Sequence, residues 1–209
     1  MKTITDIKSQ RRGRDRANIF LDGAFAFSVS KAVVKNSCIE PGQALTDSQI
    51  AELTAGDSIE KCLQSALRLL NYRPRSEAEI RLRLCRRFEK EAVDSVISQL
   101  ISMQMIDDLA FATFWKENRE SCNPRGRRLL RLELSKKGVS QEVIAEVLDG
   151  IDEEESAYRA AKKKERSLQK EDYDGFRCKM GSSLRRRGFS YEVIKRTVER
   201  IWRDSHHSS

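Results

Sequence analysis

The chain has 209 residues, of which 34% are charged and 39% are hydrophobic, and its formal net charge is +8. This composition is too apolar for a disordered chain, and the cationic excess favours either an anionic partner or solvated basic helices. No segment approaches the roughly 18 consecutive apolar residues that a membrane-spanning helix needs, and residues 1–6 contain no apolar signal core. We therefore expect a folded cytoplasmic protein without membrane contact.

The sulfur and imidazole groups give no sign of a metal or cofactor site. The five cysteines are Cys38, Cys62, Cys85, Cys122 and Cys178. Because they are scattered and none forms a CxxC pair, we expect reduced, space-filling cysteines without a disulfide framework or zinc. His206 and His207 lie in a tail, residues 205–209, that we expect to be disordered. No cofactor is expected.

Residues 1–56 are expected to form a small β-rich module with a short helix. Apolar residues alternate on both sides of Asp22-Gly23, a pair suited to the positive φ values of a tight hairpin turn. An earlier strand around residues 4–9 would complete a three-stranded sheet. Thr46 is a candidate cap for the short helix.

From residue 57 the apolar period becomes helical, with a first helix near residues 58–72, and the sequence repeats at an offset of 50. The matching apolar positions are Ile80, Leu130 and Met180; Leu84, Leu134 and Leu184; Val93, Val143 and Val193; and Ile101, Ile151 and Ile201. We therefore expect a mostly α fold in which three tandem three-helix repeats form an elongated body. Their bounds are residues 57–106, 107–151 and 152–204.

Capping residues mark the expected helix starts. Ser76 and Glu79 have the spacing of a capping box. Asp107 is expected to cap the next helix, with Phe111 in a hydrophobic staple, and Asp108 suits the positive end of the helix dipole. The two acids could instead form an acid/base or metal pair, but no His, Ser or Cys stands near them. We expect no catalytic residue.

Three glycines have distinct expected roles. Gly138 and Gly188 are placed to end helices as C′ residues. Gly126 lies in a basic segment, but the segment lacks the further glycines and the Lys-Ser/Thr of a phosphate-binding loop. Nucleotide hydrolysis is therefore not expected.

Basic residues recur on equivalent helices and are the candidate binding site. They are Arg81, Arg83, Arg86 and Arg87; Arg125, Arg127, Arg128, Arg131, Lys136 and Lys137; and Arg185, Arg186 and Arg187. Cations at a helix C-terminus complement the dipole, which explains the pairs 86/87, 136/137 and 186/187. It does not explain the arginines from 125 to 131, near a helix start. We predict a basic track along the repeats.

Aromatic side chains could stack on nucleic-acid bases, but their helical spacing favours the core for most of them. They are Tyr72, Phe111, Trp115, Tyr158, Phe189 and Tyr191.

An ordered series of segments resembles the RecX family, the bacterial regulators of the RecA recombinase. The series is Ser76-Glu77-Ala78-Glu79-Ile80, Asp107-Asp108-Leu109-Ala110-Phe111-Ala112, Gly126 followed by Leu132-Glu133-Leu134-Ser135-Lys136-Lys137-Gly138-Val139, and Arg186-Arg187-Gly188-Phe189. The resemblance covers roughly residues 60–202, and the hairpin module looks like an N-terminal extension of longer members. Phe88 stands where later repeats have Gly138 and Gly188, so the first repeat is expected to differ there.

The resemblance implies an all-helical body that binds in the groove of the RecA–DNA filament. It further implies modulation, mostly inhibition, of recombinase, ATPase and co-protease activity without enzymatic activity of its own. The expected partners are the RecA filament and single- or double-stranded DNA, contacted by a monomer. The alternative is a stand-alone, sequence-independent nucleic-acid-binding protein, whose affinity would fall steeply with salt.

Overall fold

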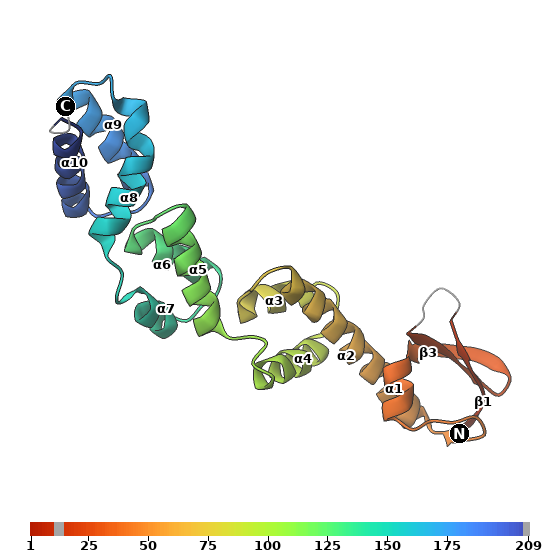
Figure 1. The fold of residues 1–209 in the computed structure, drawn as a ribbon. Helices are drawn as coiled ribbons and strands as arrows, with labels where there is room; N and C mark the ends of the chain where they lie inside the picture. The colour runs from red at the N-terminus through yellow and green to blue at the C-terminus, as the bar shows by residue number, and fades with distance from the viewer. Residues whose placement is uncertain (11–14, 207–209) are drawn as a thin grey trace. The chain divides into compact units, whose positions relative to one another are not determined.

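The computed structural model describes residues 1–10 and 15–206 as two compact units (Figure 1). The first unit comprises Met1–Arg73 and Ile80–Ile106, and the second comprises Pro74–Glu79 and Asp107–Ser209. The last helix continues through His206, whereas the tail was expected from residue 205. Residues 207–209 lie outside the described part of the chain.

A four-stranded antiparallel sheet forms the N-terminal module. Its strands are β1 (Lys2–Ser9), β2 (Arg16–Leu21), β3 (Ala24–Ser30) and β4 (Ala44–Leu45), in the order β3-β2-β1-β4. The hairpin turn is confirmed, with φ values of 49° at Asp22 and 84° at Gly23. The expectation of three strands is wrong, because β4 adds two residues beside Lys2 and Thr3. A strand of two residues is too short to show an alternation of apolar and polar residues in the sequence.

Helices close this module on one side. The short helix α1 (Lys31–Asn36) follows β3 directly and was not predicted. The helix expected at Thr46 and the helix expected near 58–72 are one continuous helix, α2 (Asp47–Tyr72). Thr46 and Gln49 form its capping box. The expected module boundary at residue 56 therefore lies inside a helix.

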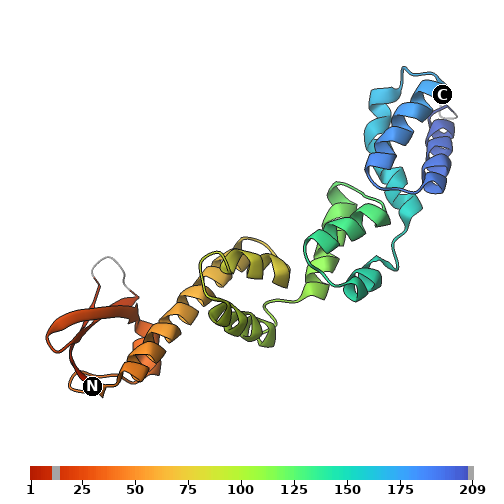
Figure 2. The same ribbon diagram turned by 180° about the vertical axis from the view of Figure 1, so that it is seen from behind.

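Each three-helix repeat has its own buried apolar cluster. The first contains the second half of α2 with α3 (Glu77–Leu84) and α4 (Lys90–Ser102). The second contains α5 (Asp108–Cys122), α6 (Arg127–Lys136) and α7 (Gln141–Leu148). The third contains α8 (Glu153–Glu165), a 3-10 turn η1 (Arg166–Leu168), α9 (Tyr173–Arg186) and α10 (Tyr191–His206). Figure 2 shows α8, α9 and α10 from behind, packed on one another.

The 50-residue offset holds for the middle helix of each repeat. Ile80, Leu130 and Met180 are buried, as are Leu84, Leu134 and Leu184. This pattern confirms the expected core positions, because residues four apart share one face of a helix.

The offset changes to 51 between the last helices of the first two repeats. Val93 and Leu100 are buried in α4 and match Ile144 in α7 and Ile151 just after α7, whereas Ile101 is 45% exposed. The expectation that Ile101 belongs to the core is wrong. The cause is a chain that is one residue shorter between equivalent core positions, since Val93 follows Leu84 by nine residues and Ile144 follows Leu134 by ten.

Phe88 therefore has a different counterpart from the one expected. It packs against the first core, as Val139 and Phe189 pack in theirs. Gly138 and Gly188 adopt φ values of 79° and 86° and end their helices as predicted. The first repeat therefore has no residue at the position of Gly138 and Gly188, and Phe88 corresponds to the residue that follows each glycine.

Candidate binding site

A concave site in the second unit gathers three of the predicted basic residues. Arg127, Arg128 and Arg131 lie on α6, and all three are exposed. The other lining residues are Glu153, Gly188, Phe189, Ser190 and Tyr191. The volume is about 520 Å³. We call this site the basic groove.

A close backbone approach, here called the glycine joint, brings the two sides of the basic groove together. The amide of Gly126 donates to the carbonyl of Arg187 at 2.9 Å. A Cβ atom at Gly126 would overlap the carbonyl of Gly188, and one at Gly188 would overlap Leu129. Gly126 therefore permits close packing between the second and third repeats.

Arg187 stabilises the same joint from within. Its Nη1 donates to Oδ1 of Asn123 and, at 3.4 Å, to the carbonyl of Pro124. Burial, and then the charge of Arg125, lower the pKa of Arg187 below its usual range. This arginine holds two repeats together, so the donors of its Nη1 are used internally.

The three arginines of the basic groove differ in how they are held. The backbone amide of Arg127 donates to Oε1 of Glu153 at 2.7 Å, and its Nη2 donates to the carbonyl of Ile151 at 3.3 Å. Among the described residues, Arg128 and Arg131 have no carboxylate within ion-pairing distance. Their charges are available to a ligand.

A related joint connects residues 74–79 to the turn between α6 and α7. Ser76 Oγ accepts from the amide of Glu79 at 3.2 Å and donates to the carbonyl of Lys137 at 2.5 Å. Lys137 Nζ lies 3.0 Å from Oε1 of Glu79. A Cβ atom at Gly138 would overlap Ala78. The predicted capping segment is thus also a packing element.

Asp107 and Asp108 have separate structural roles. Oδ1 of Asp107 accepts from the amides of Leu109 and Ala110 at 2.8 and 3.0 Å, which confirms the predicted cap. Oδ1 of Asp108 accepts from the amide of Glu77 at 2.8 Å. Burial raises the pKa of Asp108 above its usual value. Both acids are thus accounted for by backbone contacts.

The glycine joint at Gly126 has arginines beside it, whereas the related joint at residues 74–79 lacks their equivalents. At the offset of 50, Glu77 and Ala78 stand in place of Arg127 and Arg128. The cationic groove is therefore a property of the contact between the second and third repeats. Packing of the repeats does not require it, since the related joint forms without these arginines.

Arg125, another predicted site residue, belongs to a polar cluster inside the second repeat. Arg125 Nη1 lies 2.6 Å from Oε1 of Glu133, and Arg119 Nε lies 2.9 Å from Oε2. Trp115 Nε1 donates to the same Oε2 at 2.8 Å. Lys137 Nζ lies 4.1 Å from the centre of the Trp115 ring. Glu133 therefore pairs with Arg125, as well as with Arg119, inside the fold.

The predicted basic residues fall into two groups. Four are half-buried and bind other side chains: Arg81 with Asp94, Arg125 with Glu133, Lys137 with Glu79, and Arg187 with Asn123. Nine are exposed: Arg83, Arg86, Arg87, Arg127, Arg128, Arg131, Lys136, Arg185 and Arg186. Arg81, Arg83, Arg86 and Arg87 lie in the first unit and the others in the second. Exposed residues are the remaining candidates for an anionic ligand.

A second concave site of about 630 Å³ lies in the first unit. Its cationic lining consists of Arg16, Lys31, Lys61, Arg68 and Arg87, with Asp15 and Glu60 as acidic members. Of these cations only Arg87 was predicted as a site residue. Lys61 and Arg68 lie two turns apart on α2, a spacing that could have indicated a shared face.

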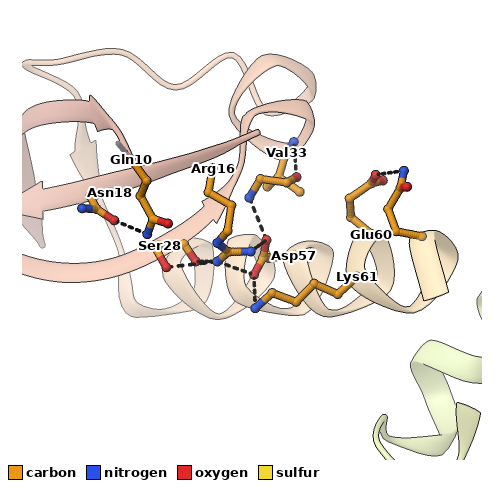
Figure 3. A network of polar contacts seen from close by, with 10 residues as sticks. Gln10, Arg16, Asn18, Ser28, Val33, Asp57, Glu60 and Lys61 are labelled. Atoms are coloured by element: carbon orange, nitrogen blue, oxygen red, sulfur yellow. Dashed lines mark hydrogen bonds and ion pairs between the residues drawn. The ribbon is translucent and has the colours of Figure 1, made fainter. Parts of the chain in front are cut away.

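Asp57 anchors α2 to the β module beside this second site (Figure 3). Its carboxylate accepts from both terminal nitrogens of Arg16 at 3.2 Å, from Lys61 at 2.8 Å and from the amide of Ser30 at 2.7 Å. Arg16 Nη2 also donates to the carbonyl of Ser28 at 2.6 Å. Burial opposes ionisation of Asp57, but these donors outweigh it and hold its pKa below the usual value.

The aromatic side chains divide between core and surface. Phe111 and Phe189 are buried and Trp115 and Tyr158 are half-buried, which agrees with a core role. Tyr72 and Tyr191 are 83% and 74% exposed. These two tyrosines are the exceptions to a core role that was predicted for most of the six aromatic residues, because Tyr72 ends α2 and Tyr191 begins α10.

Within residues 1–10 and 15–206, no three His, Cys, Asp or Glu side chains cluster as metal ligands would. Over the same residues, each helix is too short or too polar to cross a bilayer. Cys62 is buried, which raises the pKa of its thiol to about 11. The other four cysteines are exposed, so the expectation of space-filling cysteines is wrong for them.

In sequence order, a small β module is followed by three tandem three-helix domains. This order, together with the basic groove, defines the class of this protein. The regulatory protein RecX N-terminal domain matches residues 2–46. The first, second and third three-helix domains of RecX match residues 62–100, 107–148 and 152–198. The chain belongs to the RecX family of regulatory proteins.

Individual relatives agree with this assignment. The regulatory protein RecX of Clostridium botulinum is 30% identical, with 95% of this chain and 96% of the relative covered. That of Bacillus velezensis is 32% identical, covering 95% and 77%. A crystal structure of regulatory protein RecX has a TM-score of 0.74 at 28% identity, covering 93% and 98%. RecX from Lactobacillus salivarius shares the fold, with a TM-score of 0.62 at 24% identity over 70% and 97%.

Proposed function

We propose that this protein binds the RecA–DNA filament and modulates, mostly inhibits, the recombinase, ATPase and co-protease activities of RecA. Membership in a family of regulatory proteins supports a regulatory role. The basic groove carries the proposal, because the unpaired Arg128 and Arg131 lie in it beside Arg127. We propose that it binds phosphates or acidic side chains of the filament, without catalysis by this chain, in the cytoplasm.

Two units with separate cationic sites suit a polymeric partner. Each unit presents a concave surface with an excess of basic residues. A monomer could thus contact more than one place along a filament, so that the second contact forms at a high effective concentration. Such binding would slow the subunit motions that nucleotide turnover requires.

The test is the ATPase rate of RecA on single-stranded DNA. We expect the wild-type protein to lower this rate, and a variant with Arg127, Arg128 and Arg131 all changed to Glu to lose most of the effect. The matched control changes Arg159, Arg166 and Lys170 to Glu, because these exposed cations do not line the basic groove. Circular dichroism checks that both variants keep their helical content.

Unchanged ATPase rates and filament lengths at saturating wild-type protein would refute the proposal. The alternative function is sequence-independent binding to nucleic acid without contact with RecA, which the same exposed arginines favour. Binding to RecA in the absence of DNA, retained at moderate salt, argues against this alternative. Loss of all binding when DNA is omitted supports it.

A further inference from the structure

Tyr191 lines two neighbouring concave sites of the second unit at once. One is the basic groove. The other, about 430 Å³ in volume, lies along α9 and α10, and we call it the α9–α10 groove. Its residues are Tyr173, Arg177, Cys178, Gly181, Ser182, Arg185, Tyr191, Ile194, Lys195, Val198 and Glu199. Tyr191 is thus an exposed aromatic residue shared by two adjacent depressions.

The fold of the repeat does not explain an aromatic residue at this position. Tyr191 is the first residue of α10, directly after the capping residue Ser190. The equivalent first residues of α4 and α7 are Lys90 and Gln141, both polar and exposed. Exposure of 74% means that the ring of Tyr191 contributes little to the core. The ring is thus exposed to solvent where the two grooves meet.

In the described part of the chain, basic side chains without a carboxylate partner line both grooves beside the ring of Tyr191. Among the described residues, Arg128 and Arg131 in the basic groove and Arg185 and Lys195 in the α9–α10 groove have no carboxylate partner. The remaining two cations are partly engaged, because Arg177 pairs with Asp174 at 3.3 Å and Arg127 contacts a backbone carbonyl. Each groove is lined by three basic residues and one acidic residue, so each favours an anionic group.

We propose that Tyr191 is a stacking platform for one unpaired base of a single-stranded nucleic acid. The phosphates on the two sides of that base would lie in the two grooves, paired with the free arginines and Lys195. This arrangement joins the two elements of single-strand recognition, a cationic path for the backbone and an aromatic face for the bases. The inference deepens the proposed function and rests on it, since it names the DNA strand of the filament as the ligand of the basic groove.

The experiment measures binding of a labelled oligothymidylate of about 16 nucleotides, without RecA, by fluorescence anisotropy. We expect Tyr191→Ala to weaken binding by at least about fivefold, and Tyr191→Phe to bind like wild type because the ring is kept. Tyr72→Ala is the matched control. Tyr72 is also an exposed tyrosine, but it lines neither groove.

An abasic oligonucleotide of equal length separates stacking from charge. We expect Tyr191→Ala and wild type to bind it equally, because it offers phosphates without base faces. A variant with Arg128 and Arg131 changed to Gln should bind both oligonucleotides more weakly and show a smaller dependence on salt. The proposal is overturned if wild type does not bind the oligothymidylate, if Tyr191→Ala binds it normally, or if the loss is the same on the abasic strand.

The RecA ATPase assay on the same variants distinguishes this inference from the proposed function. If Tyr191→Ala weakens oligothymidylate binding while wild type leaves the ATPase unchanged, stacking stands and the proposed function fails. If wild type inhibits the ATPase and Tyr191→Ala inhibits equally with normal strand binding, the proposed function stands and stacking fails. Tyr191→Ala could instead bind the oligothymidylate normally and fail to bind DNA-free RecA. This result would assign the ring to a protein partner and overturn the proposal.

Discussion

At the scale of single residues, charge in this protein has two uses that the sequence alone does not separate. Arg187 and Arg128 are both arginines beside helix ends. The first is half-buried and bound to Asn123, while the second is exposed. Internal partners decide the difference, because a guanidinium that already donates to the fold has fewer groups to offer a ligand. The exposed arginines are therefore the better targets for binding variants.

Asp57 gives a residue-scale prediction on pH. Its folded-state pKa is lowered, so its contribution to stability is present above its unfolded value of about 3.9 and is lost as pH falls through the folded value. We expect Asp57→Asn to reduce the free energy of unfolding at pH 7 by about 1–3 kcal/mol. The measurement is urea unfolding of both proteins between pH 7 and pH 2.

The difference between wild type and Asp57→Asn should shrink toward the acidic end of that range. Other carboxylates titrate in both proteins, so they cancel in the comparison. A difference that stays constant with pH would show that the ionised carboxylate of Asp57 does not stabilise the contact between α2 and the β module.

At the scale of secondary-structure elements, the turns between helices decide how the repeats meet. The turn after α9 contains Gly188, whose carbonyl lies against Gly126. The turn after α3 lacks such a glycine, and Phe88 enters the core there. One residue more or less thus changes which face of the following helix is buried, because each residue rotates a helix by about 100°.

Gly126→Ala tests the glycine joint. Gly126 has φ −70° and ψ 154°, which alanine adopts without strain, so the clash with the backbone of Gly188 and Phe189 is what opposes the substitution. We expect a loss of about 1–3 kcal/mol in the free energy of unfolding of the second unit. Chemical denaturation monitored by tryptophan fluorescence measures it, since Trp115 and Trp202 both lie in this unit.

Gly150→Ala is the control for that experiment. No heavy atom lies within 4 Å of a Cβ atom built at Gly150. Its stability should remain within about 0.5 kcal/mol of wild type. Equal effects of the two substitutions would mean that the backbone contact at Gly126 is not tight in solution.

At the scale of the whole molecule, the apolar clusters follow the division into two units. The β module and the first repeat supply the clusters of the first unit, and the second and third repeats supply those of the second. Separate cores allow separate unfolding, because cooperativity requires shared buried contacts. A single melting temperature is then insufficient to describe the stability of the chain.

Two core variants should separate the transitions. Leu84→Ala in the first unit and Leu184→Ala in the second should each cost about 2–5 kcal/mol, because both side chains are buried. Leu184→Ala should lower the midpoint seen by tryptophan fluorescence. Leu84→Ala should lower only a transition seen by circular dichroism, because the first unit has no tryptophan. Equal shifts of the fluorescence midpoint in both variants would show that the units unfold together.

Local chemistry alone determined much of this protein. The Asp22-Gly23 hairpin, the caps at Thr46, Asp107 and Ser76, and the buried middle helices were predictable, because turn geometry, capping and helical period depend on neighbours in the chain. The caps at Ser76 and Asp107 also lie in the segments that resemble the RecX family. The repeated basic residues were visible in the same way.

Only the tertiary structure decided which charges and rings are available to a partner. Arg125 and Lys137 bind Glu133 and Glu79, Tyr191 stands exposed between two grooves, and Lys31 and Arg68 line a site that no local pattern joined. The sequence records each residue's chemistry and its position along the helix. Exposure and pairing depend on contacts with residues far along the chain, and those contacts exist only once the repeats have packed.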